Sequence, residues 1–232
     1  MPPTPKTPSG HQKHILAEKA REKDQHLKAL KFIEEAIVFY QQEKDYFGLG
    51  QALQSRFLIY KHLFLLTKDE VFALMGQKDV EVSLYLAKKY KLLNLIGSCY
   101  FRLGESASLF KNYPQGIIYF KKALKNYQGS QAEKGDYRYH LGVVLHKSGR
   151  EKQGLKTILQ GLEEIRQFSS GVNPFLAHVW ESGCLLQLAK LLKIDQPQKA
   201  KKYLMQALKI TNADKDLVIR RRQIKEIADK LT

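Results

Sequence analysis

The chain has 232 residues and a mass of 26.8 kDa, with 44% hydrophobic and 27% charged residues, so its composition excludes a wholly disordered protein. Lys and Arg number 39 against 23 Asp and Glu, which gives a formal net charge of +16 at pH 7. Two cysteines cannot form a disulfide framework, and no uncharged stretch reaches the roughly 18 apolar residues of a membrane helix. We therefore expect a cytoplasmic protein without a membrane span.

Taken in order, the chain begins with a proline-rich segment and continues as helix. Residues 1–10 hold four of the seven prolines, which predicts a disordered tail. From His11 onward the apolar residues recur at helical spacing, and no segment alternates apolar and polar residues as a strand does. Pro114, Pro174 and Pro197 stand where helices should begin. The sequence thus predicts an all-α fold of nine or ten helices, near 11–44, 48–66, 69–89, 93–110, 114–127, 131–147, 150–167, 174–193, 197–211 and 213–231.

Small residues recur at fixed intervals in three segments of this helical region. A small residue on each of two antiparallel helices lets them approach closely, and a large residue one turn later fills the gap between them. The pattern therefore predicts a close helix crossing in each segment. The three sets are Gly104, Gly116, Phe120 and Ala123; Gly142, Gly154, Ile158 and Gly161; and Ala189, Ala200, Leu204 and Ala207.

These segments resemble tetratricopeptide repeats. The stretch LGESASLFKNYPQGIIYFKKAL (Leu103–Leu124) is similar to one helix–turn–helix unit, and the stretches at 141–162 and 188–208 resemble it as well. ALKFIEEAI (Ala29–Ile37) looks like a second helix whose partner lies in the N-terminal region. The unequal repeat lengths resemble the long-helix subclass. The resemblance implies a solenoid of antiparallel helix pairs over residues 11–212, with residues 213–232 as a C-terminal capping helix.

Signatures of catalysis or metal binding are weak. The stretch GLGQAL at 48–53 lacks the third glycine of a dinucleotide loop, and GVVLHKS at 142–148 lacks the second glycine of a phosphate-binding loop. Cys99 and Cys184 are far apart and lie in apolar helices, where a lone thiol is usually part of the core. We therefore expect no enzyme, no cofactor and no metal site.

The first helix of each pair in such a solenoid lines the concave face, so its outward stripe is the expected binding groove. Aromatic, amide and charged side chains share this stripe, and their mixture suits a peptide or an amphipathic helix of a partner protein. The candidate groove residues are Gln54, Lys61, Phe101, Glu105, Asp136, Tyr139, His146, Lys190 and Lys193.

The basic residues allow a second interpretation. Positive charge is concentrated at 88–125 and 190–232, and such segregation attracts acidic partners, RNA included. Lys121, Lys122, Arg220, Arg221 and Arg222 would form a patch for an anionic partner. A protein-interaction scaffold is the leading hypothesis. The alternatives are a basic repeat protein that binds RNA or DNA, and the sensing half of a peptide-responsive bacterial regulator.

Overall fold

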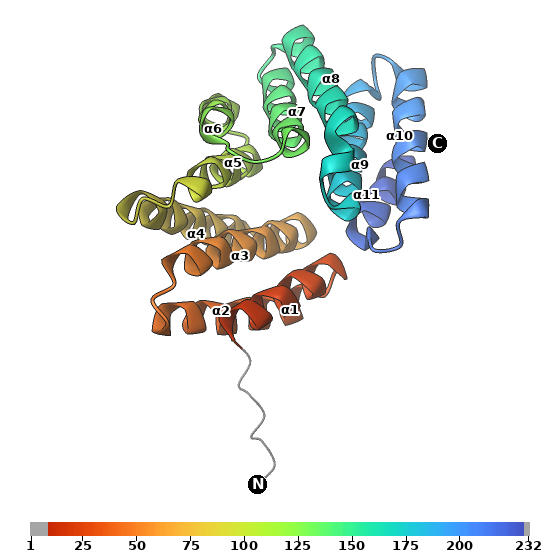
Figure 1. The fold of residues 1–232 in the computed structure, drawn as a ribbon. Coiled ribbons are helices and arrows are strands. Elements are labelled where there is room, and N and C mark those ends of the chain that lie inside the picture. The colour runs from red at the N-terminus through yellow and green to blue at the C-terminus, as the bar shows by residue number, and fades with distance from the viewer. Residues whose placement is uncertain (1–8, 230–232) are drawn as a thin grey trace. The chain divides into compact units, whose positions relative to one another are not determined.

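A computed structural model describes residues 9–229, and within this range it contains α-helices, one short 3-10 helix and no strand (Figure 1). The all-α fold is confirmed. Most predicted helices agree with the observed ones to within two residues at each end. The α-helices are α1 (Gly10–Glu22), α2 (His26–Gln42), α3 (Tyr46–Thr67), α4 (Glu70–Lys89), α5 (Leu93–Leu109), α6 (Tyr113–Asn126), α7 (Gln131–Lys147), α8 (Glu151–Phe168), α9 (Pro174–Leu192), α10 (Pro197–Ala213) and α11 (Val218–Ala228).

The N-terminal region differs from the prediction in two ways. Residues 11–44 form the helix pair α1 and α2 rather than one helix, because Asp24 turns the chain with a φ of 62°. Helix α1 also begins earlier than expected. The Ser9 hydroxyl accepts from the backbone N–H of Gln12, whose side chain accepts from the Ser9 N–H, so Ser9 and the buried Gly10 are ordered and not part of a tail. The rest of the predicted tail, residues 1–8, lies outside the described residues.

Short side chains and prolines set the starts of several other helices. Proline occupies the first turn of α6, α9 and α10, as predicted. The Asn112 side chain accepts from the N–H of Gln115, and the Asn173 side chain accepts from the N–H of Phe175. These contacts satisfy N–H groups that have no partner inside the helix.

Five helix connections use one and the same three-residue turn. In each, the middle residue has a positive φ, and the N–H of the following residue donates to the carbonyl five positions earlier, at 2.8–3.0 Å. This is the Schellman arrangement of a helix C-terminus. The middle residues are Asp24, Lys44, Lys91, Lys111 and Gly149.

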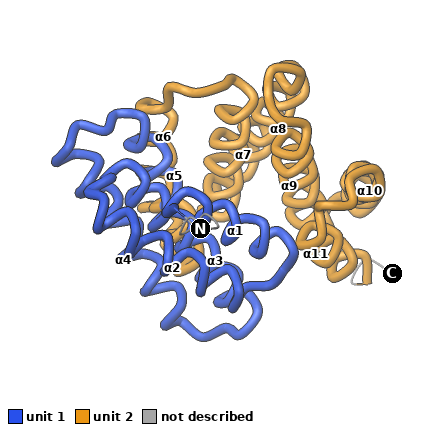
Figure 2. The backbone as a smooth tube through the Cα atoms, turned by 60° about the horizontal axis from the view of Figure 1, so that its bottom comes forward, with its two compact units in different colours: residues 1–102 blue, residues 103–232 orange. Residues whose placement is uncertain are grey.

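The chain divides into two compact units, Met1–Arg102 and Leu103–Thr232 (Figure 2). In the first unit, α1 pairs with α2 and α3 pairs with α4. Ile33, Phe57 and Val80 are fully buried there, and Gly76 lets α4 approach the ring of Phe57. Arg56 of α3 holds Asp79 of α4 through two hydrogen bonds of 2.8 and 2.7 Å.

In the second unit, α7 and α8 cross at the small residues that the sequence pattern singled out. A Cβ atom on Gly142 would stand 2.8 Å from the carbonyl oxygen of Gly154, and a Cβ on Gly161 would stand 2.6 Å from that of Gly135. The close crossing predicted at 142–161 is therefore confirmed. Ile158 and Leu185 fill the space beside it, and both are fully buried.

The C-terminal helix is shorter than the predicted 213–231, since α11 spans Val218–Ala228. It packs against α9 and α10 of the same unit. Leu217 and Ile224 are 3% and 2% exposed, so the segment buries these two apolar side chains. Arg220 on the same helix is half-buried, and its Nη2 atom lies 3.4 Å from the carbonyl oxygen of Val179.

Candidate functional site

Most of the side chains predicted to line the groove are buried. An open binding surface needs accessible side chains, but five of the nine candidates are at most 8% exposed. These five therefore do not line an open groove in this structure. They are Gln54, Phe101, Glu105, Asp136 and Tyr139.

Gln54 belongs to a buried polar network between helices of the first unit. Its side-chain nitrogen donates to the hydroxyl of Ser83 at 3.2 Å and to the sulfur of Cys99 at 3.4 Å. Ser83 in turn donates to the carbonyl oxygen of Gly50 at 2.8 Å. The amide of Gln54 thus joins helices to one another, and the sequence spacing gave no sign of these partners because they lie on other helices.

Tyr139 lies in the core of the second unit. A Cβ atom on Gly183 of α9 would stand 2.9 Å from its hydroxyl oxygen and 2.8 Å from the Nη2 atom of Arg220 on α11. Burial raises the pKa of Tyr139 well above its ordinary value. The ring therefore packs among α9 and α11, at a position where Gly183 leaves room for it.

Beside Tyr139, a polar cluster joins α5 and α7. His140 stacks on the Tyr139 ring with 4.1 Å between ring centroids. Its Nδ1 atom is 2.9 Å from the carbonyl oxygen of Asp136, and its Nε2 atom is 4.0 Å from the Glu105 carboxylate. The structure thus places Glu105, Asp136 and Tyr139 around His140 in the interior, and not on an outward groove.

The remaining candidates are accessible but dispersed. Lys193 is exposed, and Lys61, His146 and Lys190 are half-buried. The proposed anionic patch is also divided. Lys121 and Lys122 are exposed on α6, whereas the arginines lie on α11, far from α6 within the second unit (Figures 1 and 2). Arg221 donates to the carbonyl oxygen of Lys215, and Arg222 is 3.8 Å from the Glu226 carboxylate.

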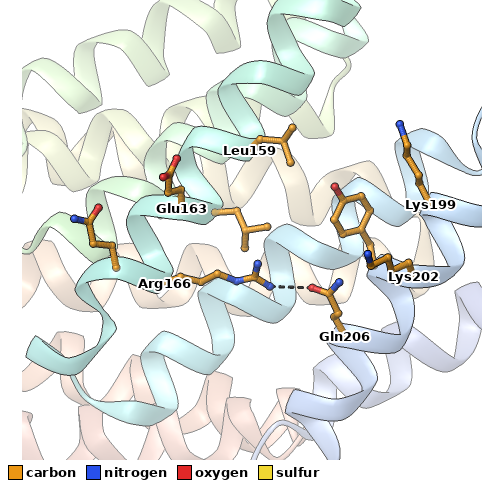
Figure 3. A pocket seen from close by; sticks show the side chains of 9 residues that line it. Leu159, Glu163, Arg166, Lys199, Lys202 and Gln206 are labelled. Atoms are coloured by element: carbon orange, nitrogen blue, oxygen red, sulfur yellow. Dashed lines mark hydrogen bonds between the residues drawn. The ribbon is translucent and has the colours of Figure 1, made fainter.

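The second unit does contain a groove, which lies on the second helices of two successive pairs. It encloses about 800 Å³ between α8 and α10 (Figure 3). A hollow of this size is within the range of ligand sites in proteins. Its lining residues are Leu159, Leu162, Glu163, Arg166, Gln167, Lys199, Lys202, Tyr203 and Gln206.

Helical periodicity explains why these residues face one another. The α8 residues stand at positions 159, 162, 163, 166 and 167, and the α10 residues at 199, 202, 203 and 206, so each set covers one face of its helix. Large side chains come from both walls: Leu159 of α8 is 44% exposed, and Tyr203 of α10 is half-buried. The helical periodicity of each set could be read from the sequence, but only the fold shows that α8 and α10 face one another across the groove.

Arg166 crosses the groove at one end. Its Nη2 atom donates to the Oε1 atom of Gln206 on α10 at 2.9 Å, shown as the dashed line in Figure 3. Its Nε atom donates to the Oε1 atom of Glu181 on α9 at 2.7 Å. The guanidinium therefore links three helices while 45% of its side chain remains exposed to solvent.

Metal ligands and reactive thiols do not gather into a site in the part of the chain that the structure describes. Among residues 9–229, no three His, Cys, Asp or Glu side chains gather as metal ligands would. Both cysteines are free and fully buried, as expected for core thiols. None of the helices in this described range is long and apolar enough to cross a bilayer. The groove between α8 and α10 presents apolar, amide and charged groups.

Comparison with known proteins identifies the fold. No family model and no curated protein sequence matches the chain. Solved structures do. BtubC of P. vanneervenii superposes with a TM-score of 0.62 at 16% identity, over 88% of this chain and 80% of that one. A putative kinesin light chain of Podospora anserina with tetratricopeptide-like repeats superposes at 0.57 and 11% identity, over 90% and 99%.

A third similar structure is the Rap conjugation gene regulator of plasmid pLS20 in complex with the Phr* peptide. Its TM-score is 0.66 at 15% identity, and the match covers all of this chain but 65% of the Rap chain. This chain therefore spans about two thirds of the length of that regulator. Together these likenesses show that the chain has a tetratricopeptide-like helical-repeat fold.

Proposed function

We propose that the chain is a non-catalytic protein-interaction module that binds a segment of a partner protein in the groove between α8 and α10. The groove itself carries this proposal. It combines accessible apolar surface from Leu159 and Tyr203 with polar groups along both walls, as interfaces for short protein segments do.

The fold supports the same function. The Rap regulator with a similar fold was solved in complex with the Phr* peptide, and another similar structure is a Rap protein complexed with Competence and Sporulation Factor. The likeness concerns architecture, so it supports a binding role and leaves the partner to be found. We place the site on the second helices because the predicted first-helix residues Asp136 and Tyr139 are buried.

Site-specific photo-crosslinking tests this proposal. A photoreactive amino acid in place of Leu159, in the full chain, should crosslink a defined protein in the native cell. Tyr203→Ala should reduce that crosslink at least about fivefold, because loss of a buried aromatic contact commonly costs more than tenfold in affinity. Met205→Ala is the matched control, since Met205 is on the same helix, is 62% exposed and does not line the groove.

Crosslinking that is equal in the Tyr203→Ala and Met205→Ala variants would contradict a site in this groove. Nucleic acid is the alternative ligand, because α10 carries four lysines and no acidic residue. In that case single-stranded RNA should bind with a logarithmic salt slope of about −0.7 for each phosphate contacted. Protein crosslinking from Leu159 would then be absent.

A further inference from the structure

We infer that this groove selects an acidic amphipathic segment, and that Glu181 competes with this segment for Arg166. The inference rests on the proposed function and specifies its partner chemistry. Three observations carry it: the charges along the groove walls, the length and apolar floor of the groove, and the contacts that Arg166 already makes.

The charges along the groove favour an acidic occupant. Three cationic side chains line it, Arg166, Lys199 and Lys202, against the single carboxylate of Glu163. Among the described residues, Lys199 and Lys202 have no carboxylate within 4.0 Å, and both are exposed. Cations that are not already paired inside the protein can form ion pairs with a ligand. A basic segment would meet repulsion at the same positions.

The floor of the groove favours an amphipathic occupant over a merely acidic one. Leu159 and Tyr203 offer accessible apolar surface beside the charged residues, and Leu162 also lines the groove although it is only 4% exposed. From Leu159 to Gln167 the wall of α8 is about 12 Å long at 1.5 Å per residue, which matches two turns of a helix. Two apolar side chains one turn apart could therefore reach the floor while acidic neighbours meet the lysines.

At Arg166, a carboxylate of the protein itself occupies a position that a ligand carboxylate could take. The carboxylate of Glu181 holds the Nε atom at 2.7 Å, on a guanidinium that is 45% exposed at the groove. A ligand carboxylate that approaches the other N–H groups of Arg166 meets the negative charge of Glu181 and competes with it for the guanidinium charge. Removing the Glu181 charge should therefore make Arg166 a stronger anion site, whereas a purely structural ion pair would contribute nothing to ligand affinity.

Peptide binding to the full chain tests the inference directly. The probe is a labelled peptide of about 16 residues, long enough to be helical by itself, with leucines three and four positions apart and glutamates on both flanks. The comparison peptide has lysine at every glutamate position. By fluorescence anisotropy at about 0.05 M salt, the acidic peptide should bind at least about tenfold more tightly, and the ratio should fall at about 0.5 M salt.

Three variants locate the effect. The double variant Lys199→Gln and Lys202→Gln should lower the affinity for the acidic peptide about five- to tenfold. The matched control, Lys121→Gln and Lys122→Gln, removes the same charge from α6. It should change the affinity for the acidic peptide less than twofold. Glu181→Gln should raise the affinity about two- to fivefold. Melting curves of the two lysine variants should coincide with wild type, because these four side chains are exposed. Glu181 is half-buried, so the melting curve of Glu181→Gln shows whether its fold is intact before its affinity is compared.

Equal binding of the acidic and basic peptides, or loss of affinity in the control variant alone, would overturn the acidic preference. Unchanged binding in Glu181→Gln would overturn the competition at Arg166. Neither result depends on the crosslinking experiment: a protein that crosslinks from position 159 while both peptides bind equally would leave the interaction module standing with a different partner chemistry. RNA binding without binding of either peptide would overturn both.

Discussion

Gly142 and Ile158 lie so close that the crossing of α7 and α8 has no room for a side chain at position 142. A Cβ atom there would stand 2.6 Å from the Cγ1 atom of Ile158 and 2.7 Å from its backbone nitrogen. A side-chain carbon can move aside, but a backbone nitrogen inside a helix moves only with the helix. The distance between the two helices therefore depends on this glycine.

Gly142→Leu should destabilise the second unit by about 1–3 kcal/mol or more, because overpacking forces the backbone apart. Trp180, the single tryptophan, lies on α9 of that unit, so its fluorescence in a urea titration reports the change. Gly171→Ala is the control, since a Cβ atom at position 171 would have no neighbouring atom within 4 Å. Equal midpoints for both variants would show that the crossing is not closely packed.

Arg56→Ala should destabilise the first unit by about 3 kcal/mol at pH 7. Asp79 is 6% exposed, and the variant would leave its carboxylate buried without the two hydrogen bonds from the guanidinium. Burial already raises the pKa of Asp79, and Arg56 opposes that shift. Circular dichroism of urea unfolding measures the loss.

The pH dependence of this loss has a defined sign. A carboxyl group whose pKa is raised in the folded state contributes stability below its unfolded pKa and loses it as the pH rises through the folded value. The deficit of Arg56→Ala against wild type should therefore shrink as the pH is lowered toward the pKa of an ordinary Asp. In the double variant Arg56→Ala, Asp79→Asn, the stability deficit should no longer change with pH. If the deficit of Arg56→Ala alone does not change with pH, that would contradict a buried charge on Asp79.

The two cysteines should react slowly with thiol reagents in the folded protein. Burial raises the pKa of Cys99 to about 11 and also raises that of Cys184. At pH 8 roughly one Cys99 thiol in a thousand is then a thiolate, which is the reactive form. Stopped-flow reaction with a disulfide reagent should be at least a hundredfold slower than in urea, and fast reaction would refute core burial. Cys99→Ser and Cys184→Ser variants would report opening of each unit separately.

Ile224→Ala should cost the second unit about 2–5 kcal/mol, because this side chain of α11 is 2% exposed. Val218→Ala on the same helix should cost much less, since Val218 is 36% exposed. Thermal unfolding followed by Trp180 fluorescence compares them. Two equally small shifts would show that α11 is not packed as a structural part of the unit.

Local sequence signals predicted most helices of this fold together with their ends, but they missed one break between helices. Periodicity and prolines at helix starts sufficed for α6, α9 and α10, because both signals are local. The break between α1 and α2 was missed since its turn residue is Asp24. Glycine usually marks a left-handed position, and among the five three-residue turns only the one at Gly149 has it.

The site was less predictable than the fold. The register of α7 placed Tyr139 on an outward stripe, but Gly183 and Arg220 from later helices surround it, and the spacing within one helix cannot show this. The groove between α8 and α10 was missed for the same reason, because its two walls lie on different helices. Leu159 and Tyr203 each follow an ordinary helical period, and only the distance between their helices makes a binding site of them.

The five identical turns also determine which face of the following helix turns toward the core. Each leaves three residues between one helix and the next, so the first buried position of the following helix is set by the backbone of the turn. One additional residue in the turn at Gly149 would rotate the start of α8 by about 100° and carry Ile158 away from Gly142. Helix lengths range from 11 residues in α11 to 22 in α3, yet these five connections keep a single length. In these five turns, an added residue should therefore disturb the packing of the following helix, although the turns themselves lie between the helices.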